Sequence, residues 1–262
     1  NKSQQLSQWN KLTEDFRSFG GTAENLLQRE GSLGLGLFPI DPSQPVELCV
    51  PDHLLISTDN LELRDGAIAI KNPSGYPSGY SDWYERFQAN YSWGAEARQS
   101  IKFFEDGLKS LPDSLQRKLN ILGLLNANKR YPGINEEQEL FQRFIATRQI
   151  VRNNRKVLMP MMELVNHSPN KKSWIMAKDS ISIRGQYKGE ILVRYSVGDP
   201  LRRCLQYGFN CKEPLGFSVN LSLNHNDKQI YVKGGINYDP FFSAEPVIRD
   251  NIVVINKPLI GS

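Results

Sequence analysis

Apolar residues near the start of the chain recur at the three- and four-residue steps of a helix. They are Leu6, Trp9, Leu12, Phe16 and Phe19, and Gly20-Gly21 follows them. This pattern predicts an amphipathic helix over residues 4–19 that ends at the glycine pair. From residue 33 to residue 56 the chain changes to short apolar runs separated by Gly and Pro, which predicts strands and turns.

Residues 72–94 are rich in Gly, Pro and aromatic side chains. We expect a long loop whose aromatic residues pack against the core, and a lid over a binding site is the alternative. Apolar spacing then predicts three helices, over 95–111, 113–127 and 136–153.

The third of these predicted helices carries Arg148 and Arg152, four residues apart. That spacing predicts that both point from one face of the helix. Taken alone, a solvated basic face explains the pair equally well. The spacing by itself therefore assigns no function to the two arginines.

Beyond His167 the composition becomes strand-like again. Apolar and β-branched residues concentrate in short runs at 174–177, 180–183, 189–195, 205–209, 217–223, 230–232 and 252–255. The chain therefore reads as β, then a helical insert, then β. This order predicts an α+β fold, mainly β and built of small sheets, and lacks the strand–helix alternation of a doubly wound sheet.

Composition narrows the class of protein. The chain has 262 residues, 39% of them hydrophobic, which suffices for one large domain or one domain with an insert. Its net charge is +4, with 32 basic and 28 acidic residues interleaved, so we expect no dedicated nucleic-acid binding.

Cysteine usage and hydropathy bear on the compartment. Cys49, Cys204 and Cys211 are an odd, widely spaced set without a Cys-x-x-Cys pair. They predict neither a disulfide scaffold nor a metal site. No apolar run approaches a membrane span, and the polar first residues have no signal-peptide core. We expect an intracellular protein, in the cytoplasm, or in an organelle if the N-terminus was trimmed.

The most informative segment is 158–168, which reads Leu-Met-Pro-Met-Met-Glu-Leu-Val-Asn-His-Ser. It sets an uncharged polar cluster directly after an apolar run, where unpaired polar groups are costly if buried. His167 is the only one of the three histidines in such a pattern. The amide of Asn166 can donate and accept in one plane, as a purine edge requires.

Two further segments are weak when taken alone. Residues 31–38 read Gly-Ser-Leu-Gly-Leu-Gly-Leu-Phe, which would let a ligand approach the backbone closely. Because Pro39 follows and no Gly-Lys-Ser/Thr is present, this segment matches neither the dinucleotide nor the phosphate-loop fingerprint. A tight strand connection explains it as well. Residues 207–209, Tyr-Gly-Phe, are common beside strands and turns.

In this order the segments resemble SET-domain protein methyltransferases. The resemblance rests on Gly-Leu-Gly-Leu-Phe at 34–38, Thr-Arg-Gln at 147–149, segment 158–168, residues 188–195 and Tyr-Gly-Phe at 207–209. The chain is most similar to the branch typified by the Rubisco large-subunit lysine methyltransferase, in which a helical insert interrupts the SET fold. The resemblance implies S-adenosylmethionine (SAM) as the cofactor and methyl transfer to a lysine side chain of a protein substrate.

The same resemblance implies a division of the chain. Residues 1–30 form an N-terminal helix and lead-in, 31–58 the first SET part, and 59–153 a mostly helical insert. Residues 154–214 then form the second SET part with the cofactor and catalytic motifs, and residues 215–262 a β-rich C-terminal segment. We expect no membrane partner and no metal.

The cofactor residues are carried over position by position. Backbone groups of Leu33, Gly34 and Leu35 match those that hold the methionine moiety. Arg148 matches the arginine that pairs with the cofactor carboxylate, for which a planar fork of donors is suited. Asn166 and His167 match the pair that reads the adenine edge, so we expect His167 to bind and not to act as a base.

Tyr207 matches the catalytic tyrosine, which also borders the cofactor and orients the incoming amine. Methyl transfer is an in-line displacement, in which orientation supplies much of the rate. On the substrate side, Arg152, Glu163 and Trp174 match positions that face the substrate; Glu163 stands where the family branch has Asp. Trp174 follows a loop of different length.

The chain departs from the family pattern before Tyr207. Residues 199–204 read Asp-Pro-Leu-Arg-Arg-Cys, and Pro200 removes a backbone donor and fixes φ. A histidine-methylating branch shares the fold but differs at the positions of Ile150 and Met162, so lysine is preferred. From another class, a non-catalytic SET-like binding module is the alternative, although Tyr207 and the Asn-His pair are both present.

Overall fold

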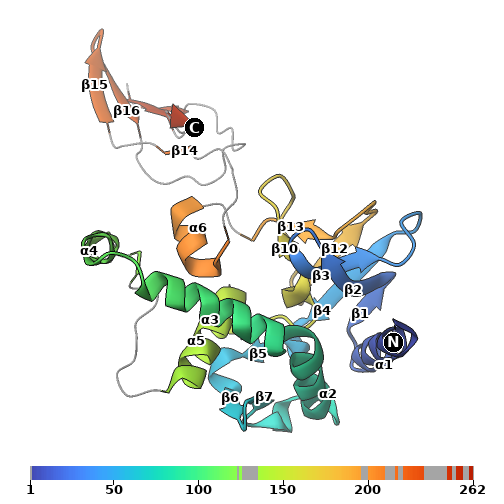
Figure 1. Ribbon diagram of the computed structural model, residues 1–262. Coiled ribbons are helices and arrows are strands. Elements are labelled where there is room, and N and C mark those ends of the chain that lie inside the picture. Colours follow the sequence, from blue (N-terminus) through green and yellow to red (C-terminus); the bar gives the residue numbers. More distant parts are fainter. Residues whose placement is uncertain are drawn as a thin grey trace. The chain divides into compact units, whose positions relative to one another are not determined.

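A computed structural model (Figure 1) describes residues 2–122, 124–125, 135–195, 200–209, 216–217, 221–232, 247–249, 252–255 and 260–261. Helices and several small sheets are mixed along the chain, which confirms the α+β class. The chain divides into two compact units: unit 1 is Asn1–His167 with Lys171–Val193, and unit 2 is Ser168–Asn170 with Arg194–Ser262.

The described residues of unit 1 form five small sheets. The largest is antiparallel with the order β1-β4-β12-β11, formed by Thr22–Glu24, Val46–Pro51, Ser180–Gly185 and Ile175–Met176. A hairpin pairs β2 (Leu26–Gly31) with β3 (Gly34–Pro39), and another pairs β6 (Leu61–Arg64) with β7 (Ala67–Ile70). The order β5-β9-β8 joins Ile56–Ser57, Arg155–Leu158 and Ile150–Arg152. Finally, β10 (Asn166–His167) runs parallel to β13 (Leu192–Val193).

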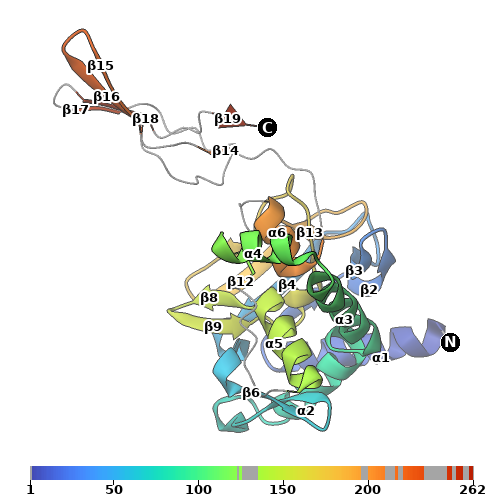
Figure 2. The ribbon, with the colours of Figure 1, turned by 60° about the vertical axis from the view of Figure 1, so that its left-hand side comes forward.

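The helices of unit 1 are α1 (Lys2–Ser18), α2 (Tyr80–Phe87), α3 (Ala95–Lys109), α4 (Asp113–Ile121) and α5 (Glu136–Arg148). Short 3-10 turns occur at η1 (Asp52–Leu54), η2 (Thr58–Asn60), η3 (Pro73–Gly75) and η6 (Met162–Leu164), and η4 (Gln88–Ser92) is a π-turn. Figures 1 and 2 show α3 and α5 side by side. The Glu105–Arg143 ion pair, 3.3 Å, joins these two helices. Within the insert predicted at 59–153, residues 61–70 form the β6–β7 hairpin and most of the rest is helical.

The structure of residues 72–94 differs from the long loop that was predicted there. Its aromatic residues do pack into the core, as expected, but the segment is helical where a long loop was predicted, because it contains α2 and the π-turn η4. The buried set, all with exposed fractions of 0%, is Tyr80, Trp83, Tyr84 and Phe87. Their spacing of three, one and three residues is that of one helix face, and the neighbouring Gly and Pro residues obscured it.

Indole groups tie distant segments of unit 1 together. Trp9 Nε1 donates to the carbonyl of Leu26 at 2.8 Å, and Trp83 Nε1 donates to the carbonyl of Leu12 at 2.9 Å. Trp93 Nε1 donates to the carbonyl of Gly66 at 2.9 Å. All three side chains are buried, so each N–H has found the partner that a buried indole requires.

The helix predicted over 136–153 is wrong at its C-terminal end. Helix α5 ends at Arg148, and a β8–β9 hairpin follows. Asn153 and Asn154 have φ values of 51° and 59°, the left-handed pair of a type I′ turn, which asparagine tolerates. Arg148 and Arg152 therefore do not share a helix face. The helix predicted over 113–127 is α4, which ends at Ile121; residues 126–127 lie outside the described residues.

The helix of unit 2 among the described residues is α6 (Pro200–Tyr207), so the prediction of strand-like structure at residues 205–209 is wrong. Pro200 occupies the first turn of this helix, where the missing N–H has no intrahelical partner to lose. The strands are β14 (Gly216–Phe217) paired with β19 (Ile260–Gly261), and a sheet with the order β15-β16-β18-β17. That sheet joins Leu221–His225, Lys228–Val232, Ile252–Ile255 and Val247–Arg249.

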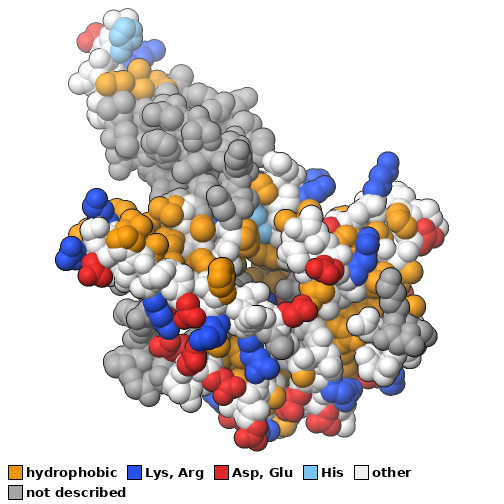
Figure 3. All heavy atoms as spheres, in the orientation of Figure 1, with side chains coloured by type: hydrophobic (Ala, Val, Ile, Leu, Met, Phe, Trp, Pro, Cys, Tyr) orange, Lys and Arg blue, Asp and Glu red, His pale blue; other side chains and the backbone are white. Residues whose placement is uncertain are grey.

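The surface carries mixed charge. Figure 3 shows acidic and basic side chains interspersed on the face that it presents. Among the described residues, no helix has the length and apolar character to cross a membrane. Within the same ranges, no three His, Cys, Asp or Glu side chains gather in a way that would hold a metal ion.

Candidate functional site

The β2–β3 turn holds the three residues predicted to contact the methionine moiety. Gly31 pairs with Gly34, so Ser32 and Leu33 form the turn between the strands. Gly34 has a φ of +90°, and no heavy atom lies within 4 Å of the position that a Cβ would take. The flanking Leu33 and Leu35 are 54% and 45% exposed. The backbone of this turn therefore faces open space that a ligand can enter.

Asn166 connects this hairpin to the polar cluster 131 residues further along the chain. Its Nδ2 donates to the carbonyl of Leu35 at 3.0 Å and to Glu190 Oε1 at 2.7 Å. The backbone N–H of Ile191 donates to the carbonyl of Leu37 at 2.8 Å. Two of the segments singled out in the sequence thus lie in direct contact.

Gly36 allows this close approach. A Cβ there would overlap Glu190 Oε1 and lie 2.8 Å from Asn166 Nδ2. Both Nδ2 hydrogens of Asn166 are used within the protein, and no described residue donates to its Oδ1. This arrangement leaves the Oδ1 acceptor of Asn166, and not the donor–acceptor pair expected from the sequence. His167 is buried beside it in β10.

Arg148 and Glu163 are two further predicted site residues, and both belong to unit 1. Arg148 ends α5, with its guanidinium carbon 4.0 Å from the centroid of the Phe144 ring and its Nη1 2.9 Å from Thr147 Oγ1. Glu163 lies in η6, where its Oε1 accepts from Gln88 Nε2 at 2.8 Å and from Ser92 Oγ at 2.5 Å.

The electrostatics of Glu163 are set by burial. Burial raises the pKa of its carboxyl above the usual value, while Ser92, the positive charge of Arg148 and Gln88 act in the opposite direction. Gln88 and Ser92 were not predicted as site residues, because they are isolated polar residues within an aromatic segment. Their shared position in the π-turn η4 emerges only from the structure.

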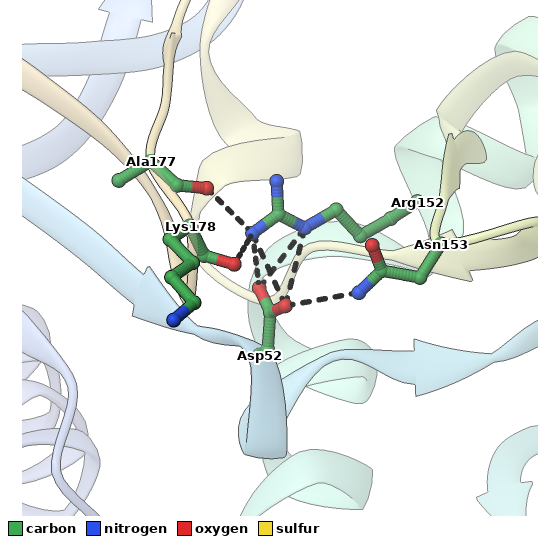
Figure 4. A network of polar contacts seen from close by, with 5 residues as sticks. All are labelled: Asp52, Arg152, Asn153, Ala177 and Lys178. Carbon is green, nitrogen blue, oxygen red and sulfur yellow. Dashed lines mark hydrogen bonds and ion pairs between the residues drawn. The ribbon is translucent and has the colours of Figure 1, made fainter.

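The guanidinium group of Arg152 forms an ion pair and hydrogen bonds with other residues of the protein (Figure 4). Its Nε lies 3.1 Å from Asp52 Oδ1, and its Nη2 lies 2.9 Å from the same oxygen. Nη2 also donates to the carbonyls of Ala177 and Lys178, at 2.7 and 3.0 Å. The arginine therefore fastens β8 to η1 and to the β11–β12 turn. We name the Arg152–Asp52 pair the clasp.

The other two predicted site residues are Trp174 and Tyr207. Trp174 is half-buried and directly precedes β11 in unit 1. Tyr207 belongs to unit 2, as the last residue of α6, and Gly208 follows with a φ of +82°. The ring of Tyr207 packs against Tyr195 and Phe209, with centroids 5.5 and 5.8 Å away. Burial raises the pKa of Tyr207, and Arg203 lowers it, so the phenol keeps its proton at neutral pH.

Comparison with known proteins gave matches among solved structures alone. No family model and no curated protein matches the chain. The SET domain of LSMT bound to lysine and AdoHcy is 16% identical, with a TM-score of 0.42, over 81% of this chain and 60% of that one. Rubisco LSMT bound to AdoMet is 17% identical, with a TM-score of 0.42, over 80% and 60%. The chain thus spans 60% of the length of either structure.

Proposed function

We propose that this chain is a SET-domain methyltransferase that transfers a methyl group from SAM to the side-chain amine of a lysine in a protein substrate. One observation carries the proposal: the Asn166 amide lies 3.0 Å from the carbonyl of Leu35 across 131 residues of sequence. Two segments to which the resemblance assigns cofactor contacts therefore meet, as one binding site requires.

The residues present suit this cofactor. The open backbone at Gly34 gives room for the amino-acid part, and Arg148 supplies a cation for its carboxylate. Asn166 Oδ1 offers an acceptor to an N–H group of the ligand. When bound, the cofactor supplies a sulfonium methyl group as the electrophile.

The protein's own contribution is orientation. The incoming lysine must lose its proton, which apolar surroundings favour because they penalise the ammonium form. Tyr207 stays a neutral phenol, since burial raises its pKa, and it orients the amine by hydrogen bonding without acting as a base. Arg152, Glu163 and Trp174 border the substrate in this proposal. Because Arg152 and Glu163 are bonded to other protein groups, we assign them to shaping that surface.

The division into SET parts and insert, and an intracellular setting, stay predictions. Two alternatives stay open. A non-catalytic module predicts cofactor binding without transfer, and a histidine methyltransferase predicts label on an imidazole. The test separates these outcomes.

The experiment has a binding arm and a transfer arm. S-adenosylhomocysteine at millimolar concentration is expected to raise the melting temperature, since a ligand at a hundredfold excess over its Kd stabilises by about 2.7 kcal/mol. Labelled methyl groups from SAM are expected on lysine in a lysate of the source organism. The absence of any thermal shift would remove the cofactor from the proposal.

The variant Tyr207→Phe tests the catalytic assignment. It is expected to bind S-adenosylhomocysteine as wild type does and to lose most of the methyl transfer. Tyr231→Phe is the matched control, because it removes a hydroxyl from a half-buried tyrosine of the same unit. Wild-type transfer rates in Tyr207→Phe would exclude Tyr207 from the mechanism.

A further inference from the structure

The carboxyl group of Glu163 is held by two donors on one of its oxygens only. Gln88 Nε2 and Ser92 Oγ both donate to Oε1, at 2.8 and 2.5 Å. Both donors come from the π-turn η4, and Trp93 N closes that turn on the carbonyl of Gln88 at 2.7 Å. This contact joins the helical segment at 80–92 to the segment at 158–168.

The second oxygen of each group is buried without a donor. Glu163 Oε2 and Gln88 Oε1 are both inaccessible to solvent, and neither has a hydrogen-bond partner among the described residues. In the amide orientation of the structure, the NH2 group donates to Glu163 Oε1 and lies 3.0 Å from the hydroxyl of Tyr84. Two buried acceptors are thus left over, on side chains that are already hydrogen-bonded to each other, and each is costly while unsatisfied.

A single proton on Glu163 would give both of these oxygens a hydrogen-bond partner. We propose that Glu163 is protonated in the folded protein at neutral pH and donates from Oε2 to Gln88 Oε1, so that acid and amide form a cyclic pair. The amide then donates through Nε2 and accepts through Oε1, while the acid does the reverse. Every hydrogen-bonding atom of the pair has a partner, which an ionised carboxylate cannot achieve, since it only accepts.

Charged and titratable groups lie on several elements around Glu163. Tyr84 and Tyr80 of α2 are fully buried, and burial raises the pKa of each, so both stay neutral. Arg148 of α5 is the cation whose charge reaches Glu163. On β4, Glu47 pairs with Arg184 at 2.7 Å, and Cys49 is a free thiol. Strand β3 has no titratable side chain. Burial nevertheless raises the pKa of Glu163, in the direction that the pair requires.

A consequence for the cofactor rests on the proposed function. An ionised Glu163 would compete with a ligand carboxylate for the charge of Arg148. A neutral Glu163 does not, so it acts as a positioning residue that leaves the field of Arg148 to the ligand. The proton would then be a condition for tight binding of an anionic cofactor.

The first measurement needs no cofactor. We expect the ¹³C resonance of the Glu163 carboxyl, assigned by its loss in Glu163→Gln, to show no titration up to pH 7. Exposed glutamates titrate near pH 4.3. Titration of Glu163 together with these exposed groups would overturn the proposal.

The second measurement compares the stability of wild type and Glu163→Gln, whose amide keeps an NH2 donor in place of the acid O–H. A raised folded-state pKa means that the folded state retains a proton that the unfolded state has lost. Between the unfolded and the folded pKa, wild type should therefore lose about tenfold in its folding equilibrium constant, relative to Glu163→Gln, for each pH unit of increase. A ratio that stays constant or rises with pH would contradict the proton assignment.

Two controls complete the design. Ser92→Ala removes a donor to Oε1 but leaves the acid–amide pair, so its pH profile should keep the wild-type shape. The double variant Gln88→Glu with Glu163→Gln exchanges acid and amide and should restore the pH dependence that Glu163→Gln lacks. If S-adenosylhomocysteine binds, its affinity for wild type should fall at a pH above the folded pKa, and Glu163→Gln should not show this fall. If it binds at no pH, the proposed function fails while the proton result stands.

Discussion

The clasp between Arg152 and Asp52 is a partly buried ion pair, and its contribution to the free energy of unfolding can be measured. The arginine side chain is 12% exposed and the aspartate side chain 27% exposed, so the pair is screened only in part by solvent. Hydrogen bonds to charged groups contribute about 1.5–3 kcal/mol each when buried. Allowing for the partial exposure of Asp52, we expect a coupling free energy of about 2 kcal/mol between the two side chains.

A double-mutant cycle of Asp52→Ala and Arg152→Ala measures this coupling by denaturant unfolding. Arg152→Ala should cost more than Asp52→Ala, because it also removes the donors to the carbonyls of Ala177 and Lys178. The melting temperature should fall by about 2–4 °C per kcal/mol in a protein of this size.

The chain supplies a matched control. Arg184 and Glu47 form an ion pair of 2.7 Å across the adjacent strands β12 and β4, but their side chains are 60% and 38% exposed. Exposed pairs of this kind typically couple by about 0.2–1 kcal/mol. Equal coupling in the two cycles would refute the reasoning, because burial would then have no effect. A coupling free energy near zero in the clasp would argue against a stabilising role for Arg152 and would leave only the substrate-facing role expected from the sequence.

Two further predictions concern the backbone around the site. Gly36→Ala should destabilise the protein by about 1–3 kcal/mol in denaturant unfolding, because its Cβ would overlap Glu190. Gly75→Ala, where no atom lies within 4 Å of the new Cβ, should change stability little. Asn153→Ala should cost about 1–2 kcal/mol, because its φ of 51° is left-handed, whereas Asn153→Gly should not. Equal stability of these two Asn153 variants would contradict the turn assignment.

Periodic patterns were predictable from the sequence, and ends of elements were not. The N-terminal helix was predicted over 4–19 and observed over Lys2–Ser18, because its apolar stripe is uninterrupted. The predicted helix over 136–153 extends past the observed C-terminal end of α5 at Arg148, because Ile150 and Val151 continue a plausible helical pattern. The turn formed by Asn153 and Asn154 is what separates β8 from β9. Residues 205–209 were read as strand-like because the helical face of α6 is short.

Contacts between distant polar residues were beyond sequence reasoning altogether. Gln88 and Ser92 reach Glu163 across 75 and 71 residues, and single polar residues carry no periodicity that would reveal such a pairing. The resemblance implied that the segments of Leu35 and Asn166 both bind the cofactor, but it implied no contact between the two residues. The donor to that contact, and the part taken by Glu190, required the structure.

The buried indoles have a practical consequence. All four tryptophans of the chain, Trp9, Trp83, Trp93 and Trp174, belong to unit 1. Intrinsic tryptophan fluorescence is therefore a built-in label for the unfolding of unit 1, while unit 2 is silent in this emission. A far-ultraviolet circular dichroism curve reports on both units. Any separation between the two unfolding curves measures directly how independently the units melt.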